Sequence, residues 1–160
     1  MRTPDLVLLL IALAGPAAAD PLPGMAGSWT GSGWARQVPD GPEEALRCRI
    51  ENAYEAERTR LRITGKCAVP GRQFAIDGAL KAEADGSVGG FWSNPDGPGQ
   101  TAIAGQVRDD AVYFTFRATD PKSGRDVSQT VTWRLEGESL AFRSVDRANE
   151  SPMAEIAFTR

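Results

Sequence analysis

Apolar and polar residues alternate with a period of two along most of this chain, from Trp29 almost to Arg160. Between Leu46 and Ile50 the apolar residues take the even positions, and between Leu61 and Cys67 they take the odd ones. Successive side chains of a β-strand point to opposite faces, so each such run predicts a strand with one buried face. The apolar spacing of three and four residues that predicts long helices is missing. The chain is therefore expected to be all-β.

Further runs of the same kind raise the expected number of strands to about ten. Their apolar members are Phe74/Ile76/Leu80, Val88/Trp92, Ile103/Val107, Val112/Phe114/Phe116, Val127/Val131/Trp133/Leu135, Leu140/Phe142 and Ile156/Phe158. Turn residues such as Asp85-Gly86 and Ser123-Gly124 separate them, which predicts an antiparallel up-and-down meander. Such a meander hides its apolar face by closing into a barrel or by packing on a second sheet. We expect a barrel of about eight to ten strands, because closure also removes exposed edges.

The two cysteines, Cys48 and Cys67, bear on the register of one hairpin. Redox-active cysteines are usually separated by only two residues, as in Cys-x-x-Cys, so this distant pair predicts a structural disulfide. If the two face each other, antiparallel pairing sets the following residues opposite one another: Ile50 and Gly65, Asn52 and Ile63, Tyr54 and Leu61. Nearly all the apolar members then share one face, so the bridge is expected inside the barrel. The turn falls at Glu57-Arg58, and the Ala-, Glu- and Arg-rich stretch 52–60 is interpreted as the hairpin tip.

The first 19 residues have the three parts of a secretory signal peptide. Arg2 lies in a short n-region, an apolar run extends from Leu6 to Ala14, and Ala17-Ala18-Ala19 precedes the expected cleavage site. The apolar run is too short to span a membrane, so no anchor is expected after cleavage. We therefore expect a signal peptide at 1–19, a single β-barrel domain at 20–160, and a periplasmic or secreted location, where a disulfide is stable.

Composition excludes several kinds of chemistry. The chain contains no His, so a Ser-His-Asp triad and His-ligated zinc or haem are ruled out within it. Its formal net charge is -3, and its 18 Lys and Arg residues are interleaved with 21 Asp and Glu residues. Nucleic acid needs a concentrated positive field and is not an expected partner. We expect no catalytic activity, no metal site and no cofactor.

Three short segments resemble fragments of catalytic or metal sites and are better explained as backbone features. Asp109-Asp110 is an adjacent carboxylate pair, but it falls at an expected hairpin tip. The stretch 120–126 has carboxylates around a Gly, yet it lacks enough oxygen ligands for calcium and carries Lys122 and Arg125. Ser32 stands between two glycines but has no base to activate it. These glycines are expected to let the first strand bend.

Large aromatic side chains fall on the inward positions of the expected strands: Trp29, Trp92, Trp133, Phe74, Phe114, Phe116, Phe142 and Phe158. Either they fill the barrel as an ordinary core, or some of them line a ligand cavity. Inward Gly78, Gly90 and Gly105 would leave room for such a cavity. The candidate ligand-binding residues are Trp29, Tyr54, Trp92, Phe114, Phe116 and Trp133. The proline-containing loop from Arg36 to Glu44 is expected at the mouth of the barrel.

Gly27-Ser28-Trp29, at the start of the first expected strand, resembles the Gly-x-Trp signature of the calycin superfamily, which includes lipocalins, avidins and bacterial metalloprotease inhibitors. The chain is most similar in appearance to uncharacterised exported calycin-like proteins of bacteria. The resemblance implies a barrel whose Trp29 closes one end, with an arginine from a late strand packed over the ring. Arg143 and Arg160 are both candidates for that arginine. The calycin resemblance implies a fold and a compartment, and no activity.

Three functional hypotheses follow from these observations. The first is a non-enzymatic barrel that binds a small apolar ligand at the mouth near Arg36 to Glu44. The second is a protein-binding module, such as an inhibitor of a secreted protease that inserts the segment Asp20 to Ala26 as a strand. The third is a hydrolase, which would need a carboxylate cluster that the sequence alone does not reveal. The sequence does not indicate an oligomeric state.

Overall fold

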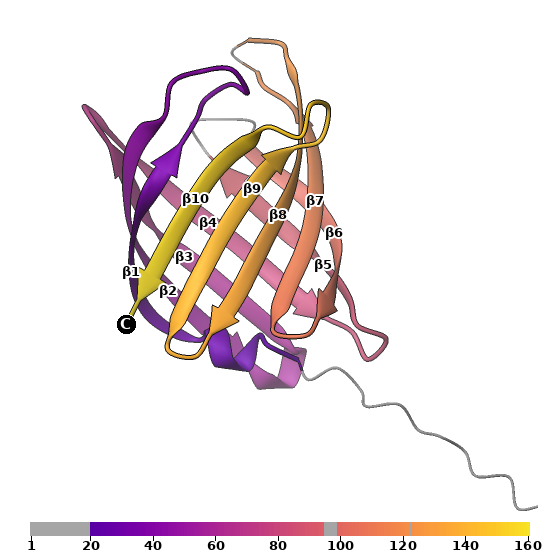
Figure 1. Ribbon diagram of the computed structural model, residues 1–160. Helices are drawn as coiled ribbons and strands as arrows, with labels where there is room; N and C mark the ends of the chain where they lie inside the picture. The colour runs from indigo at the N-terminus through magenta and orange to yellow at the C-terminus, as the bar shows by residue number, and fades with distance from the viewer. Residues whose placement is uncertain (1–19, 95–98, 122) are drawn as a thin grey trace, which may run out of the picture.

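The computed structural model describes residues 20–94, 99–121 and 123–160, and the expected leader at 1–19 lies outside them. The described chain forms one closed barrel of ten antiparallel strands (Figure 1). The strands are β1 (Gly27–Ala35), β2 (Glu44–Glu55), β3 (Arg60–Val69), β4 (Arg72–Ala82), β5 (Ser87–Asn94), β6 (Gly99–Arg108), β7 (Ala111–Thr119), β8 (Asp126–Glu136), β9 (Ser139–Asp146) and β10 (Pro152–Thr159). Each strand pairs with its neighbours in sequence, and β1 closes the barrel against β10. The predicted all-β meander is confirmed.

The alternation of apolar and polar residues in the sequence corresponds to an alternation of buried and exposed residues in the strands. Along β2, residues from Leu46 to Asn52 are buried at the even positions and exposed at the odd ones. The predicted hairpin register is confirmed, with Cys48 opposite Cys67, Asn52 opposite Ile63 and a disulfide between the two cysteines. Both cysteines are 2% exposed, so the bridge lies inside the barrel wall.

The tip of this hairpin contains one turn of helix as well as the expected turn. Strand β2 continues to Glu55 and β3 begins at Arg60, so the expected hairpin is present. Between them lies a single turn of 3-10 helix, η2 (Ala56–Arg58), followed by Thr59 with a positive φ of 46°. A second short 3-10 helix, η1 (Pro23–Met25), precedes β1.

The two ends of the barrel differ in how they are covered. At one end, here called the closed end, η1 and η2 lie close to the C-terminus (Figure 1). Leu22 and Met25 are fully buried there and complete the core beneath Trp29. At the opposite end, here called the mouth, the connections β1–β2, β7–β8 and β9–β10 extend beyond the strands (Figure 1). The predicted loop after β1 is therefore found at the mouth, between Ala35 and Glu44.

The closed end is held by Trp29 and its neighbours. The Trp29 Nε1–H donates a hydrogen bond of 3.0 Å to the carbonyl oxygen of Met25, which also accepts one of 2.9 Å from Asn52 Nδ2. The guanidinium carbon of Arg160 lies 4.7 Å from the centre of the Trp29 ring. Of the two candidate arginines, Arg160 therefore occupies the position over the ring, whereas Arg143 is paired with Glu155 on the outer face.

Candidate ligand-binding cavity

The mouth half of the barrel encloses a cavity of about 160 Å³. Six aromatic side chains contribute to its wall: Phe74, Trp92, Phe116, Trp133, Phe142 and Phe158. Aliphatic residues and the Cys48–Cys67 disulfide complete the apolar lining. The closed half is filled by side chains, so the barrel combines a packed core at one end with a cavity towards the other.

Four of the aromatic rings pack against one another and make one wall of the cavity rigid. Trp92 stacks on Phe142 with ring centres 6.0 Å apart, and Trp133 meets Phe142 edge-on at 5.1 Å. Trp133 also stacks on Phe158 at 5.7 Å. Such contacts fix ring orientations beyond simple burial. The wall is therefore preformed without a ligand.

The room in the barrel does not come from the inward glycines that the sequence singled out. A Cβ placed on Gly78 would lie 2.9 Å from the Trp92 ring, and one on Gly105 would lie 1.9 Å from the Tyr113 carbonyl oxygen. Gly90 has a φ of 138°, and a Cβ there would lie 1.9 Å from the Ala79 carbonyl oxygen. These glycines permit close packing. The cavity lies instead beside short side chains near the mouth, namely Ala35, Gly99, Thr101, Ser144 and Ala154.

Few polar groups reach the lining, and most of them are uncharged. Thr101 and Ser144 are buried, at 8% and 4% exposure, and Gln129 is half-buried. Arg36 is the single charged residue among the described lining residues. Its guanidinium already donates to Glu43 at 2.6 Å and lies 5.2 Å from the centre of the Trp34 ring on the outside of the rim. The cavity therefore presents an apolar, nearly uncharged interior.

Trp133 adds one unpaired donor to this environment. Its indole Nε1 is buried and has no hydrogen-bond acceptor among the described residues. An indole N–H normally finds a partner when it is buried, and leaving a buried donor unpaired costs about 1–3 kcal/mol. A packed core gains nothing from an unpaired indole N–H, whereas a binding site can tolerate one.

The structure divides the six candidate ligand-binding residues into two groups. Trp92, Phe116 and Trp133 line the cavity, whereas Trp29, Tyr54 and Phe114 do not. Phe114 lies behind Trp92, with ring centres 6.2 Å apart. Tyr54 lies towards the closed end, where its hydroxyl donates to Asp20 at 3.5 Å, and partial desolvation and the Asp20 charge raise its pKa.

The segments that resembled catalytic or metal sites lie away from the cavity. Asp109 occupies a tight turn with a φ of 55°, and Asp110 pairs with Arg134 at 2.7 Å. Ser32 is exposed on the outer face of β1. Part of the stretch 120–126 is described and forms a turn in which the Gly124 N–H donates to the Asp120 carbonyl oxygen. No group of three or more Cys, Asp or Glu side chains with metal-site geometry occurs within the described ranges.

The comparisons with known proteins support the fold. The crystal structure of Rv2717c from M. tuberculosis is similar, with a TM-score of 0.68, and the match covers 89% of this chain and 98% of that one. The likeness is one of fold alone. The two sequences are 17% identical, which is too low to carry function from one protein to the other. No protein-family model matches this chain, and no curated protein matches its sequence significantly.

Within residues 20–94, 99–121 and 123–160, no helix is long and apolar enough to cross a bilayer.

Proposed function

We propose that this protein is a non-enzymatic binding protein that holds a small, neutral, apolar molecule in the mouth half of its barrel. The observation that carries the proposal is the cavity of about 160 Å³ enclosed by aromatic side chains. Protein interiors are normally close-packed, with few voids larger than a water molecule. A preformed apolar space with a few uncharged polar groups is the usual form of a small-molecule site.

The volume suits a ligand of about the size of one ring. Apolar cavities on the order of 150 Å³ accommodate benzene, whereas sites for drug-sized ligands measure roughly 300–1,000 Å³. The aromatic walls favour a flat ring, which can stack or pack edge-on as the resident rings do. Arg36 is paired with Glu43, so an anionic ligand would have to compete with that carboxylate, and a cationic ligand would find no carboxylate in the described lining.

Two matched alanine-to-leucine substitutions test this proposal. Ala154 lies in β10 on the cavity wall, and Ala102 lies in β6 with its side chain exposed. Leucine at position 154 fills the cavity, whereas leucine at position 102 does not touch it. We expect toluene at about 100 times its Kd to raise the stability of the wild type by about 2.7 kcal/mol, measured as a shift in Tm. Ala102→Leu should keep this shift and Ala154→Leu should lose most of it.

Benzoate is the polarity control for the same measurement. It has the ring of toluene but carries a charge, so it should produce a much smaller shift at equal concentration. Equal toluene shifts in the two leucine variants would place any binding outside the cavity. An absence of stabilisation by toluene and by other single-ring compounds would refute the proposed function.

The calycin-like relationship forms part of the proposal. The Gly-x-Trp resemblance implies a Trp at the closed end beneath an arginine from a late strand. Trp29 is 2% exposed and Arg160, which follows β10, packs over its ring. These two positions support the relationship beyond the barrel fold itself.

We also propose that the protein is exported. The buried Cys48–Cys67 disulfide supports an oxidising compartment such as the periplasm or the extracellular space. The intact mass of the protein isolated from its own host tests this, because export through the expected leader removes residues 1–19. A mass that retains them would contradict it.

The protease-inhibitor hypothesis receives no comparable support. The segment 20–26 that would serve as the inserted strand contains η1, and its Leu22 and Met25 are fully buried. Releasing it would expose the underside of Trp29, to which Met25 is hydrogen-bonded. Deletion of this segment should therefore destabilise the barrel, so it is not a clean test of inhibition.

A further inference from the structure

A second depression lies on the outer surface of the barrel, over β1, β2, β3, β4 and β10. Its polar lining consists of three cationic side chains, three hydroxyl side chains and one amide: Arg47, Arg49, Lys66, Thr30, Ser32, Thr159 and Gln73. We call these seven residues with their floor the basic hollow. The floor includes Ala68 and Ala157, whose small size leaves space between the long cationic side chains. No carboxylate belongs to the described lining.

The strand register forces the three cations together. Arg49 lies directly opposite Lys66 in the β2–β3 pairing, and Arg47 points to the same face two residues along β2. Like charges directly opposite each other on a sheet are destabilising. None of the three forms an ion pair within the part of the chain that the structure describes. The nearest carboxylate in the register, Glu51, is opposite Thr64 and accepts a hydrogen bond from Ser28.

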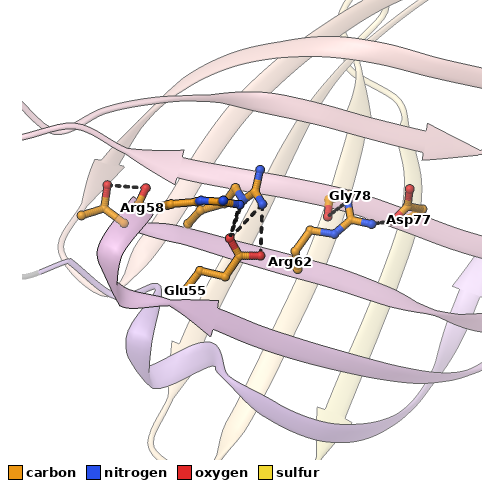
Figure 2. Close-up of polar contacts among 7 residues, drawn as sticks. Glu55, Arg58, Arg62, Asp77 and Gly78 are labelled. Atoms are coloured by element: carbon orange, nitrogen blue, oxygen red, sulfur yellow. Dashed lines mark hydrogen bonds and ion pairs between the residues drawn. The ribbon is translucent and has the colours of Figure 1, made fainter.

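Cations on the same outer face nearer the closed end are paired instead. Figure 2 shows Glu55 beside Arg58, and Arg62 joined to Asp77 and to the Gly78 carbonyl oxygen. Arg60 also pairs with Glu55, at 2.8 Å. Arg58, Arg60 and Arg62 therefore each have a carboxylate partner, whereas Arg47, Arg49 and Lys66 have none among the described ion pairs. The net charge of the whole chain is -3, so an excess of basic residues does not explain the difference.

We propose that the basic hollow binds a phosphate-bearing ligand with at least two negative charges. Guanidinium groups form charge-assisted, forked hydrogen bonds to phosphate oxygens, and a lysine adds a point charge. The register places Thr30 opposite Arg49 and Ser32 opposite Arg47, so each arginine has a hydroxyl donor beside it. A bound phosphate relieves the repulsion between Arg49 and Lys66. This site goes beyond the proposed ligand function and does not depend on it, because it lies on the other side of the barrel wall.

The test uses pyrophosphate as the free ligand and vesicles containing phosphatidylglycerol as the lipid source. Binding of pyrophosphate is followed by amide chemical shifts of the 15N-labelled protein at constant ionic strength. The test variant is Arg49→Gln/Lys66→Gln. The control is Arg117→Gln, which removes an exposed cation from β7, outside the hollow.

We expect saturable shifts confined to the strands of the hollow, β1, β2, β3, β4 and β10, and at least tenfold weaker binding in the double variant. Arg117→Gln should bind as the wild type does. The double variant should melt at or above the wild-type temperature, because it removes a like-charge pair. A lower melting temperature would contradict the repulsion between Arg49 and Lys66 that the proposed site requires.

The vesicle arm identifies the source of the phosphate. Co-sedimentation that requires phosphatidylglycerol and disappears in the double variant assigns the site to a lipid headgroup, whereas saturable pyrophosphate binding without co-sedimentation assigns it to a free phosphate compound. Non-saturable shifts, equal effects in Arg117→Gln, or an absence of binding in both arms would overturn the proposal. A failure here leaves the toluene measurement unaffected, since that ligand lies inside the barrel.

Discussion

Replacing Trp29 by alanine is expected to lower the free energy of unfolding by about 3–5 kcal/mol, the usual range for a large buried aromatic side chain. Trp29 is 2% exposed, and its indole donates to the Met25 carbonyl oxygen. The variant loses this hydrogen bond and leaves a gap in the core cluster that also contains the fully buried Leu22 and Met25. It also loses the contact with Arg160. Urea denaturation of the two proteins measures the difference.

Trp34 provides the matched control. It belongs to the same strand but points outwards, is only half-buried, and contacts Arg36 at the rim. Trp34→Ala should therefore cost less than about 1 kcal/mol. Similar losses in the two variants would mean that Trp29 does not hold the closed end in the way described.

Removing the disulfide by Cys48→Ala/Cys67→Ala is expected to lower the free energy of unfolding by about 3 kcal/mol, because the bridge closes a loop of roughly 20 residues in the unfolded chain. The cysteines are 19 positions apart and face each other across β2 and β3. The register itself should survive, since the alternation of buried and exposed residues along both strands also specifies it.

Two measurements separate the contributions of bridge and register. Near-UV circular dichroism of the double variant should keep the aromatic bands of the oxidised wild type and lose only the contribution of the disulfide itself, and urea denaturation should show the loss of stability. Reductant should destabilise the wild type towards the double variant and leave the double variant unchanged. A double variant as stable as the oxidised protein would show that the bridge contributes nothing, whereas a lost near-UV spectrum would show that the side-chain pattern cannot set the register alone.

The barrel and its best-defined hairpin could be predicted from the sequence because both follow from local rules. Alternation assigns each residue to a face, and one disulfide then fixes which residues of two strands are opposite. The pairing of Asn52 with Ile63 follows from Cys48 and Cys67 without any knowledge of the other strands. The same register, read one residue further along the hairpin, also places Arg49 opposite Lys66. The hydroxyls of the basic hollow lie on β1 and β10, whose registers no disulfide fixes.

The cavity residues were predicted less well because alternation gives the face of a residue and not its depth along the barrel. Trp29 and Trp92 both point inwards, but Trp29 lies at the closed end and Trp92 lies on the cavity wall. Depth depends on the tilt and stagger of all the strands together. Gly78 shows the same difficulty, because the space beside it is occupied by the Trp92 ring from the next strand.

A crystal structure of the protein soaked in toluene tests the central claim most directly, because it locates the ligand as well as detecting it. We expect electron density for one ring within the cavity, in contact with Trp92, Phe116 and Trp133, and little movement of these side chains. A cavity closed by collapse of the aromatic rings, or toluene bound only on the outer surface, would contradict it.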